Sequence, residues 1–212
     1  GGDSEAALFR ENLMSLNILG KVAGILALTV GLAGCMDVTM EIDVLTETTG
    51  KATTTSVMGA DIYSMVKAGA GSESSDSEGF CEEEGATLTE NADGSATCVL
   101  IAEGPFDKLG GDDGDDDGAK FEVVSPGVVK VSFTTEDMKG ELGTEEQDAQ
   151  TKAMMEQFFE GHAITIRIKG KEVIDTNMTR NGNAAEIVIP FMDLINGKAD
   201  LPPELYATVK VN

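Results

Sequence analysis

The sequence predicts an α+β fold, mainly an antiparallel β-sheet of about eight strands with two or three helices. Three observations predict it: short runs of alternating apolar and polar residues, Gly- and Asn-containing turns between them, and few segments with helical spacing. Because the strands follow one another through turns rather than crossover helices, an antiparallel sheet is favoured over a doubly wound one. A hydrophobic content of 41% supplies enough apolar side chains for a core.

Residues 37–46 are expected to form the first strand, with one face in the core. Apolar residues at every second position alternate with Thr39, Glu41 and Asp43, which is the pattern of a half-buried strand. The Thr-rich run 51–57 follows a short turn and is expected to pair with it.

Residues 61–68 are expected to form a short helix, because Ile62, Met65 and Val66 recur at helical spacing. The polar segment 69–79, rich in Gly and Ser, follows it. Its composition predicts a flexible loop.

Cys81 and Cys98 are predicted to form a structural disulfide that staples a hairpin. The turn sequence at 91–94 separates two Thr- and Val-bearing runs between them. A bridge would close a loop of about 18 residues and contribute about 3 kcal/mol in the chain-entropy model. The alternative, a redox or metal pair, would need a CxxC spacing or a neighbouring His, and the sequence offers neither.

The later part of the chain is expected to alternate hairpins with two further helices. A Pro-Gly or Asn-Gly pair marks each hairpin turn, and a capping box opens the longer helix. The predicted elements are strands at 120–125 and 128–133 around Pro126-Gly127, a helix at 144–160 between Thr144 and Gly161, strands at 163–168, 173–179 and 185–189 with a turn at Asn181-Gly182, a helical turn at 191–195, and a strand at 205–211.

An uncharged run at 22–34 follows Lys21 near the beginning of the chain. A bilayer span needs about 20 apolar residues, so this run has instead the length of the apolar region of a signal peptide. It ends in Leu32-Ala33-Gly34-Cys35, which resembles the lipobox of bacterial lipoproteins. The alternative from the residues alone is a short buried core helix that ends in a structural Cys.

The lipoprotein resemblance implies that the chain is cleaved between Gly34 and Cys35 and that the Cys35 thiol carries a diacylglyceryl group. We expect an upstream extension at 1–13, a signal peptide at 14–34, and a single extracytoplasmic domain at 35–212. An exported domain lies where disulfides persist. Because Asp37 is not directly after the lipidated Cys, the resemblance favours the outer membrane over the inner membrane.

Composition excludes several function classes. The chain has 15 Lys and Arg against 38 Asp and Glu, a net charge of −23, which is wrong for neutralising nucleic-acid phosphates. No nucleotide-binding or hydrolase motif occurs. His162 is the one histidine, and a catalytic dyad would need a nucleophile beside it. We therefore expect a protein that is not an enzyme, with a hydrolase of unknown type as the remaining catalytic alternative.

Asp113, Asp115 and Asp117 lie in the acidic loop 110–118 and match the opening of a calcium-binding loop. The match ends at Val124, where a bidentate Glu would be needed. We expect a solvated acidic loop without a cofactor, with weak Ca²⁺ binding as the alternative.

Ten methionines accompany few aromatic residues. Core filling is the simpler explanation, and an adaptable apolar cavity for a lipid ligand is the alternative. The methionines on predicted apolar faces are Met58, Met65, Met138, Met154, Met155 and Met192.

Gly170, Val173, Thr176 and Asn177 follow a predicted strand and precede a hairpin and a final strand. This order, together with the lipobox, resembles the mycobacterial envelope lipoproteins of the LppM type, although one extra residue precedes Val173. The resemblance implies a β-rich domain with helices, for which membrane glycolipids are candidate ligands. The sequence thus predicts an acyl-anchored envelope lipoprotein with a binding or structural role, and a lipid-binding or lipid-transfer module is the first alternative. Oligomeric state is not predicted.

Overall fold

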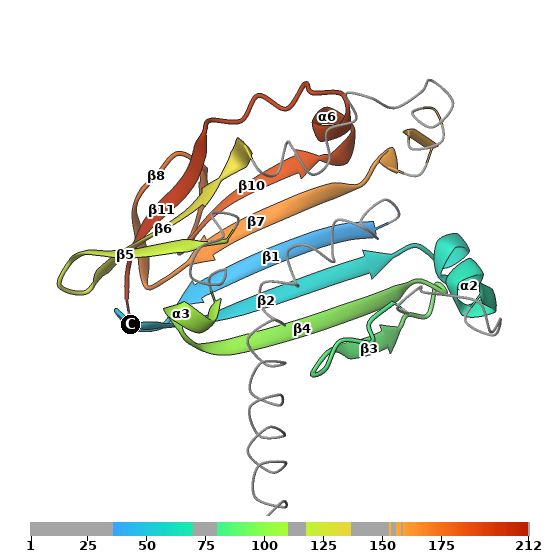
Figure 1. The fold of residues 1–212 in the computed structure, drawn as a ribbon, viewed down its shortest axis with the longest axis horizontal. Helices are drawn as coiled ribbons and strands as arrows, with labels where there is room; N and C mark the ends of the chain where they lie inside the picture. The colour runs from blue at the N-terminus through green and yellow to red at the C-terminus, as the bar shows by residue number, and fades with distance from the viewer. Residues whose placement is uncertain are drawn as a thin grey trace, which may run out of the picture.

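The computed structural model describes residues 36–69, 80–109, 118–136, 153, 156–157 and 159–211. In these residues it confirms the predicted α+β class, with two β-sheets and three helices (Figure 1). The elements are β1 (Met36–Val44), β2 (Thr49–Met58), α2 (Ala60–Gly69), β3 (Thr87–Glu90), β4 (Ala96–Pro105), α3 (Phe106–Leu109), β5 (Lys120–Ser125), β6 (Val128–Thr134), β7 (Ala163–Lys169), β8 (Glu172–Thr176), β9 (Thr179–Asn181), β10 (Ala184–Pro190), α6 (Phe191–Ile195) and β11 (Glu204–Lys210).

The larger sheet has seven strands in the order β3-β4-β2-β1-β7-β10-β9, and the smaller has four in the order β5-β6-β11-β8. The described pairings are antiparallel, as predicted, with one exception: β1 and β7 run parallel. Val38 of β1 is the partner of Ile164 of β7. The centre of the larger sheet therefore joins segments that are far apart in the sequence.

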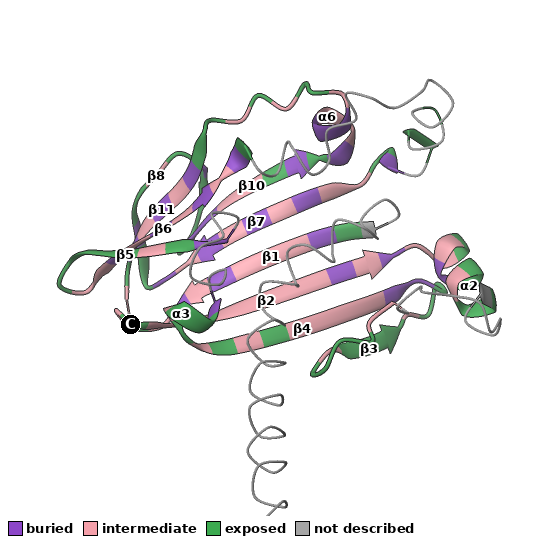
Figure 2. Ribbon diagram, viewed as in Figure 1, coloured by how far each residue is buried: buried purple, intermediate pink, exposed green. Residues whose placement is uncertain are grey.

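The alternation predicted for the first strand is confirmed. Val38 is 3% exposed and Val44 is fully buried, whereas Glu41 and Asp43 lie on the other face because successive side chains of a strand point to opposite faces. Buried and part-exposed residues also alternate along β6, β7 and β11 (Figure 2).

The smaller sheet packs against one face of the larger sheet, and both contribute to one hydrophobic core. Figure 1 shows it crossing the larger sheet near the ends of β1 and β7. Phe106 of α3 stacks on Phe121 of β5 with ring centroids 4.2 Å apart, and the Glu47 carboxylate accepts a hydrogen bond from the Gly127 N–H. These contacts join the two sheets at that end.

The opposite face of the larger sheet carries Glu41, Arg167, Ile101 and Val188, and we call it the open face. The register places these residues on the side away from the smaller sheet. Ile101 and Val188 are each 56% exposed, so this face presents apolar as well as charged side chains to its surroundings.

Two expectations about strands need correction. The described residues contain eleven strands rather than about eight, and the run predicted as one strand at 173–179 is divided between the sheets. Its first part, β8, pairs with β11, and its last residue begins β9, which pairs with β10. Asn177 marks the change, because its side chain donates to the Glu204 carbonyl and accepts from the Tyr206 N–H. The predicted turn is confirmed, with Gly182 at φ +63°.

The predicted helix at 61–68 is confirmed as α2, but the placement of Met65 on its buried face is wrong. Met65 is 65% exposed, whereas Tyr63 is 8% exposed. Ile62 and Val66 are partly buried against the core on the same side as Tyr63. Tyr63 can take the inner position because its hydroxyl donates to Glu90, which satisfies the polar end of the ring.

Most of the predicted helix at 144–160 lies outside the described residues. Its end is described: the Glu160 N–H donates to the Glu156 carbonyl at 3.1 Å, and Gly161 adopts φ +84°. This confirms the predicted stop at Gly161, where a residue without Cβ favours the left-handed conformation. None of the helices in the described ranges has the length and hydrophobicity that crossing a membrane requires.

Candidate functional site

The predicted lipidation residue comes directly before the first strand of the larger sheet. β1 begins at Met36, which is the partner of Met58 at the end of β2, and α2 starts at Ala60. Cys35 and Gly34 lie outside the described residues, so lipidation and cleavage stay predictions. We call this end of the sheet the anchor end; it comprises Met36, Met58, Ala96, Ala163 and Pro190.

His162 lies at the anchor end beside Asp37. Its Nδ1 is 3.4 Å from Asp37 Oδ2, and Asp37 Oδ1 accepts a hydrogen bond from the Ala163 N–H at 3.0 Å. The Nδ1 atom has no aligned hydrogen bond, so the contact is an ion pair only when the imidazole is protonated. Its described contacts do not include the nucleophile that a catalytic dyad needs.

Glu90 fastens α2 to the edge strand β3. Its Oε1 accepts hydrogen bonds from Lys67 Nζ at 2.6 Å and from the Tyr63 hydroxyl at 2.8 Å. These bonds, Lys67's first, lower the pKa of Glu90 from its ordinary 4.5, and the same carboxylate raises the pKa of Tyr63 and of Lys67. The Phe80 and Tyr63 rings pack edge to face, with centroids 6.1 Å apart. The cluster thus holds α2 at the anchor end.

The predicted disulfide between Cys81 and Cys98 is present, with Cα atoms 5.5 Å apart. Its position differs in detail from the expected hairpin staple. Cys98 lies in β4, but its partner residue in β3 is Leu88, and Cys81 precedes that strand. Cys81 adopts φ +70°, a turn that leads the chain back over β4. The bridge therefore fastens the segment before the hairpin.

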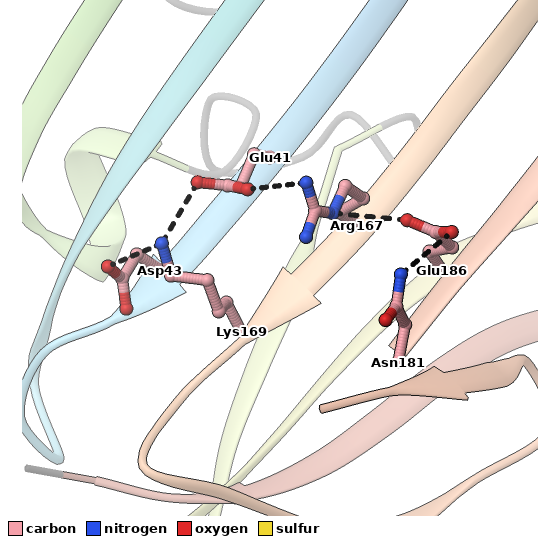
Figure 3. Close-up of polar contacts among 6 residues, drawn as sticks. All are labelled: Glu41, Asp43, Arg167, Lys169, Asn181 and Glu186. Atoms are coloured by element: carbon pink, nitrogen blue, oxygen red, sulfur yellow. Dashed lines mark hydrogen bonds and ion pairs between the residues drawn. The ribbon is translucent and has the colours of Figure 1, made fainter. Parts of the chain in front are cut away.

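A row of five charged residues crosses the open face, and we call it the charge ladder (Figure 3). Glu41 lies 3.4 Å from Arg167 and 3.1 Å from Lys169, and Asp43 lies 3.4 Å from Lys169. Arg167 Nε lies 3.2 Å from Glu186 without an aligned hydrogen bond, so this contact is an ion pair. The ladder connects β1, β7 and β10.

The charge ladder pairs its charges with one another. Its side chains are 15% to 33% exposed, and the hydrogen bond to Glu41 is the largest cause that raises the pKa of Lys169. Sequence reasoning did not identify it. The sequence places Glu41 and Asp43 on the polar face of one predicted strand and Arg167 on the polar face of another. No local pattern shows that these two strands, β1 and β7, are neighbours. The ladder stabilises the parallel junction between β1 and β7.

The acidic-loop residues Asp113, Asp115 and Asp117 lie outside the described residues. Within the part of the chain that is described, no three His, Cys, Asp or Glu side chains converge on a position that could hold a metal ion. Weak calcium binding therefore stays a prediction.

The methionines divide between core and surface. Met58 is 1% exposed and fills the core, Met65 is exposed, and Met192 is partly buried against the core. Met138, Met154 and Met155 lie outside the described ranges. The described methionines therefore do not share one apolar surface, and the lipid cavity stays a prediction.

No protein family model matches the sequence, and no curated protein matches it. Among solved structures, the chain is similar to the NMR structure of the folded domain of LppM from Mycobacterium tuberculosis. The TM-score is 0.43 at 9% sequence identity, over 84% of this chain and 90% of that one. This similarity does not assign the chain to a family.

Proposed function

We propose that this chain is a membrane-anchored bacterial envelope lipoprotein whose folded domain has a binding or structural role. The observation that carries the proposal is the lipobox-like sequence at 32–35, which ends an uncharged run of signal-peptide length after Lys21. The lipobox-like sequence ends at Cys35, and the first described strand begins at Met36. Cleavage between Gly34 and Cys35 would leave the acylated residue directly before Met36, which is paired with Met58 in the larger sheet.

The disulfide supports an extracytoplasmic location, because disulfides persist in oxidising compartments and are rare in the reducing cytosol. The excess of acidic residues, with a net charge of −23, would keep the tethered domain soluble. Met36 separates Cys35 from Asp37, which favours the outer membrane over the inner membrane.

The polar groups of the described fold support a role without catalysis. The charge ladder is occupied by mutual ion pairs, Glu90 holds α2, and Asp37 accepts from the backbone at Ala163. Each has a structural task in the fold. Anchoring itself would follow from the acyl chains, since burial contributes about 0.8 kcal/mol per CH₂ and two or more chains give stable attachment.

The intact mass of protein extracted from membranes of its host tests the proposal. We expect a chain that begins at Cys35 and carries acyl chains, and a Cys35→Ser variant that keeps its leader and has no acyl chain. A double variant, Cys81→Ser with Cys98→Ser, is the matched control and should stay acylated. Native protein with an intact leader and a free Cys35 thiol would contradict the proposal.

A further inference from the structure

We infer that the acyl anchor holds the domain end-on, with α2 and the rest of the anchor end against the phospholipid headgroups and with the open face standing away from the bilayer. This inference rests on the proposed lipidation of Cys35. The partner of the anchor end is a lipid bilayer, because the acyl chains would be attached to Cys35, and Cys35 directly precedes Met36 of β1.

No linker residue separates Cys35 from Met36, the first described residue of β1. Consecutive Cα atoms are about 3.8 Å apart, so an acylated Cys35 would place Met36 within one residue of the headgroups. Met58 is the neighbour of Met36 across the sheet, at about 5 Å, and Ala60 begins α2 two residues further on. The start of α2 is therefore held within about 17 Å of the acylated residue, since each step along the chain adds at most one Cα spacing.

The outer side of α2 suits the headgroup region. Met65 is 65% exposed, while Tyr63 uses the inner side of the helix and Lys67 is paired with Glu90. Asp61 is also exposed at the start of the helix, and an ionised carboxylate is costly to place in hydrocarbon. The helix should therefore contact the headgroups with Met65 and stay above the acyl chains.

The other end of the domain lies far from the anchor. β1 spans nine residues, which is about 30 Å at about 3.3 Å per residue. Gly127, in the turn between β5 and β6, is bonded to Glu47 beyond the end of β1, and Val124 lies close before that turn. Ile101, on the open face, lies five residues after Ala96 at the anchor end, or about 17 Å along β4.

The chain has no Trp, so single substitutions can report position. We would prepare acylated full-chain Met65→Trp, Ile101→Trp and Val124→Trp in phosphatidylcholine vesicles that contain lipid with a nitroxide on the headgroup. The three sites are similarly exposed, at 65%, 56% and 47%, and carry the same new side chain, so the preference of Trp for interfaces is matched. We expect a loss and a blue shift of fluorescence for Met65→Trp, with Ile101→Trp and Val124→Trp unchanged relative to vesicles without nitroxide.

Each other outcome overturns the inference in a distinct way. Quenching of Ile101→Trp equal to that of Met65→Trp would mean that the domain lies flat on its open face. Quenching at Val124→Trp alone would mean the reverse orientation, and no quenching at any of the three sites in acylated protein would mean that the domain stands off the bilayer. Intact mass of the same preparations separates these results from failure of the proposed function, because protein without acyl chains would overturn both proposals.

Discussion

Substitution of Gly170 by Ala should destabilise the fold, because the β7–β8 connection passes directly over the end of β11. A Cβ atom at this position would lie 2.6 Å from the Lys210 carbonyl oxygen and 2.8 Å from Val209 Cβ, distances that real Cβ atoms essentially never show. The same carbonyl accepts a hydrogen bond from the Lys171 N–H at 2.8 Å. The obstruction is therefore backbone that is already bonded, and it cannot rotate away.

The magnitude follows from two opposing effects. Overpacking of this kind typically destabilises the folded state by about 1–3 kcal/mol. Replacing Gly by Ala also reduces the conformational entropy of the unfolded chain, which stabilises the fold by about 0.4–1 kcal/mol. The net loss for Gly170→Ala should be about 1–2 kcal/mol. Gly59→Ala is the matched control, because a Cβ there meets nothing within 4 Å, and it should be neutral or slightly stabilising.

Urea denaturation followed by far-UV circular dichroism on the oxidised protein measures both variants. The midpoint of Gly170→Ala should fall below that of the parent while the slope m is unchanged. If Gly170→Ala and Gly59→Ala have equal free energies of unfolding, the close approach of the β7–β8 connection to β11 is not present in solution.

Three further perturbations test other parts of the structure. Replacing both Cys81 and Cys98 by Ser should lower the free energy of unfolding by about 3 kcal/mol, measured by urea denaturation. Arg167→Met should lower the free energy of unfolding by about 1 kcal/mol, because Glu41 and Glu186 lose their shared partner at a site a third exposed to solvent. This loss should be smaller in molar salt, which screens the ion pairs. Lys67→Met should raise the pKa of the Glu90 carboxyl, because that carboxyl loses its hydrogen bond from Lys67. A carboxyl-carbon NMR titration measures this pKa. Because that pKa is lowered in the folded state, the lost stability should be largest at neutral pH and vanish as the pH falls below the folded pKa.

Controls separate each effect from general damage. The exposed Lys171→Met should leave stability unchanged at any salt concentration, and a cost equal to that of Arg167→Met would mean that the ion pairs of the ladder do not stabilise the sheet. Reducing agent added to the parent should reproduce the double Ser variant, and a loss well below 3 kcal/mol would show that the segment before β3 unfolds separately from the core. If Lys67→Met leaves the pKa of Glu90 unchanged, the contact between Lys67 and Glu90 does not hold α2 in solution.

The local elements were predictable from the sequence because each depends on neighbouring residues. The alternation in 37–46 gave β1, and the turns at Gly127 and Gly182 gave two hairpins with positive φ at the predicted glycines. The split of 173–179 was not predictable, because Asn177 changes sheets by bonding to β11, a strand more than twenty residues later.

The features of the candidate site depended on pairings that no local pattern contains. The parallel neighbours β1 and β7 bring Glu41 beside Arg167, and each strand alone shows only a polar face. The inner side of α2 was missed for another reason. Helical spacing favoured Met65, but Tyr63 gained the inner position through its hydrogen bond to Glu90, a residue on a separate strand.

The parallel pairing of β1 with β7 has a consequence for folding after the proposed export. Asp37 and Ala163 are bonded across a separation of 126 residues, and a chain that is secreted from its N-terminus delivers β1 long before β7. Until then, one side of β1 has unsatisfied backbone groups, which is the arrangement that invites wrong intermolecular pairing. Pairing at such a distance also slows folding. If the chain is exported as proposed, newly translocated chains should depend on a chaperone outside the cytoplasm, or on being kept apart from one another, until the last third has arrived.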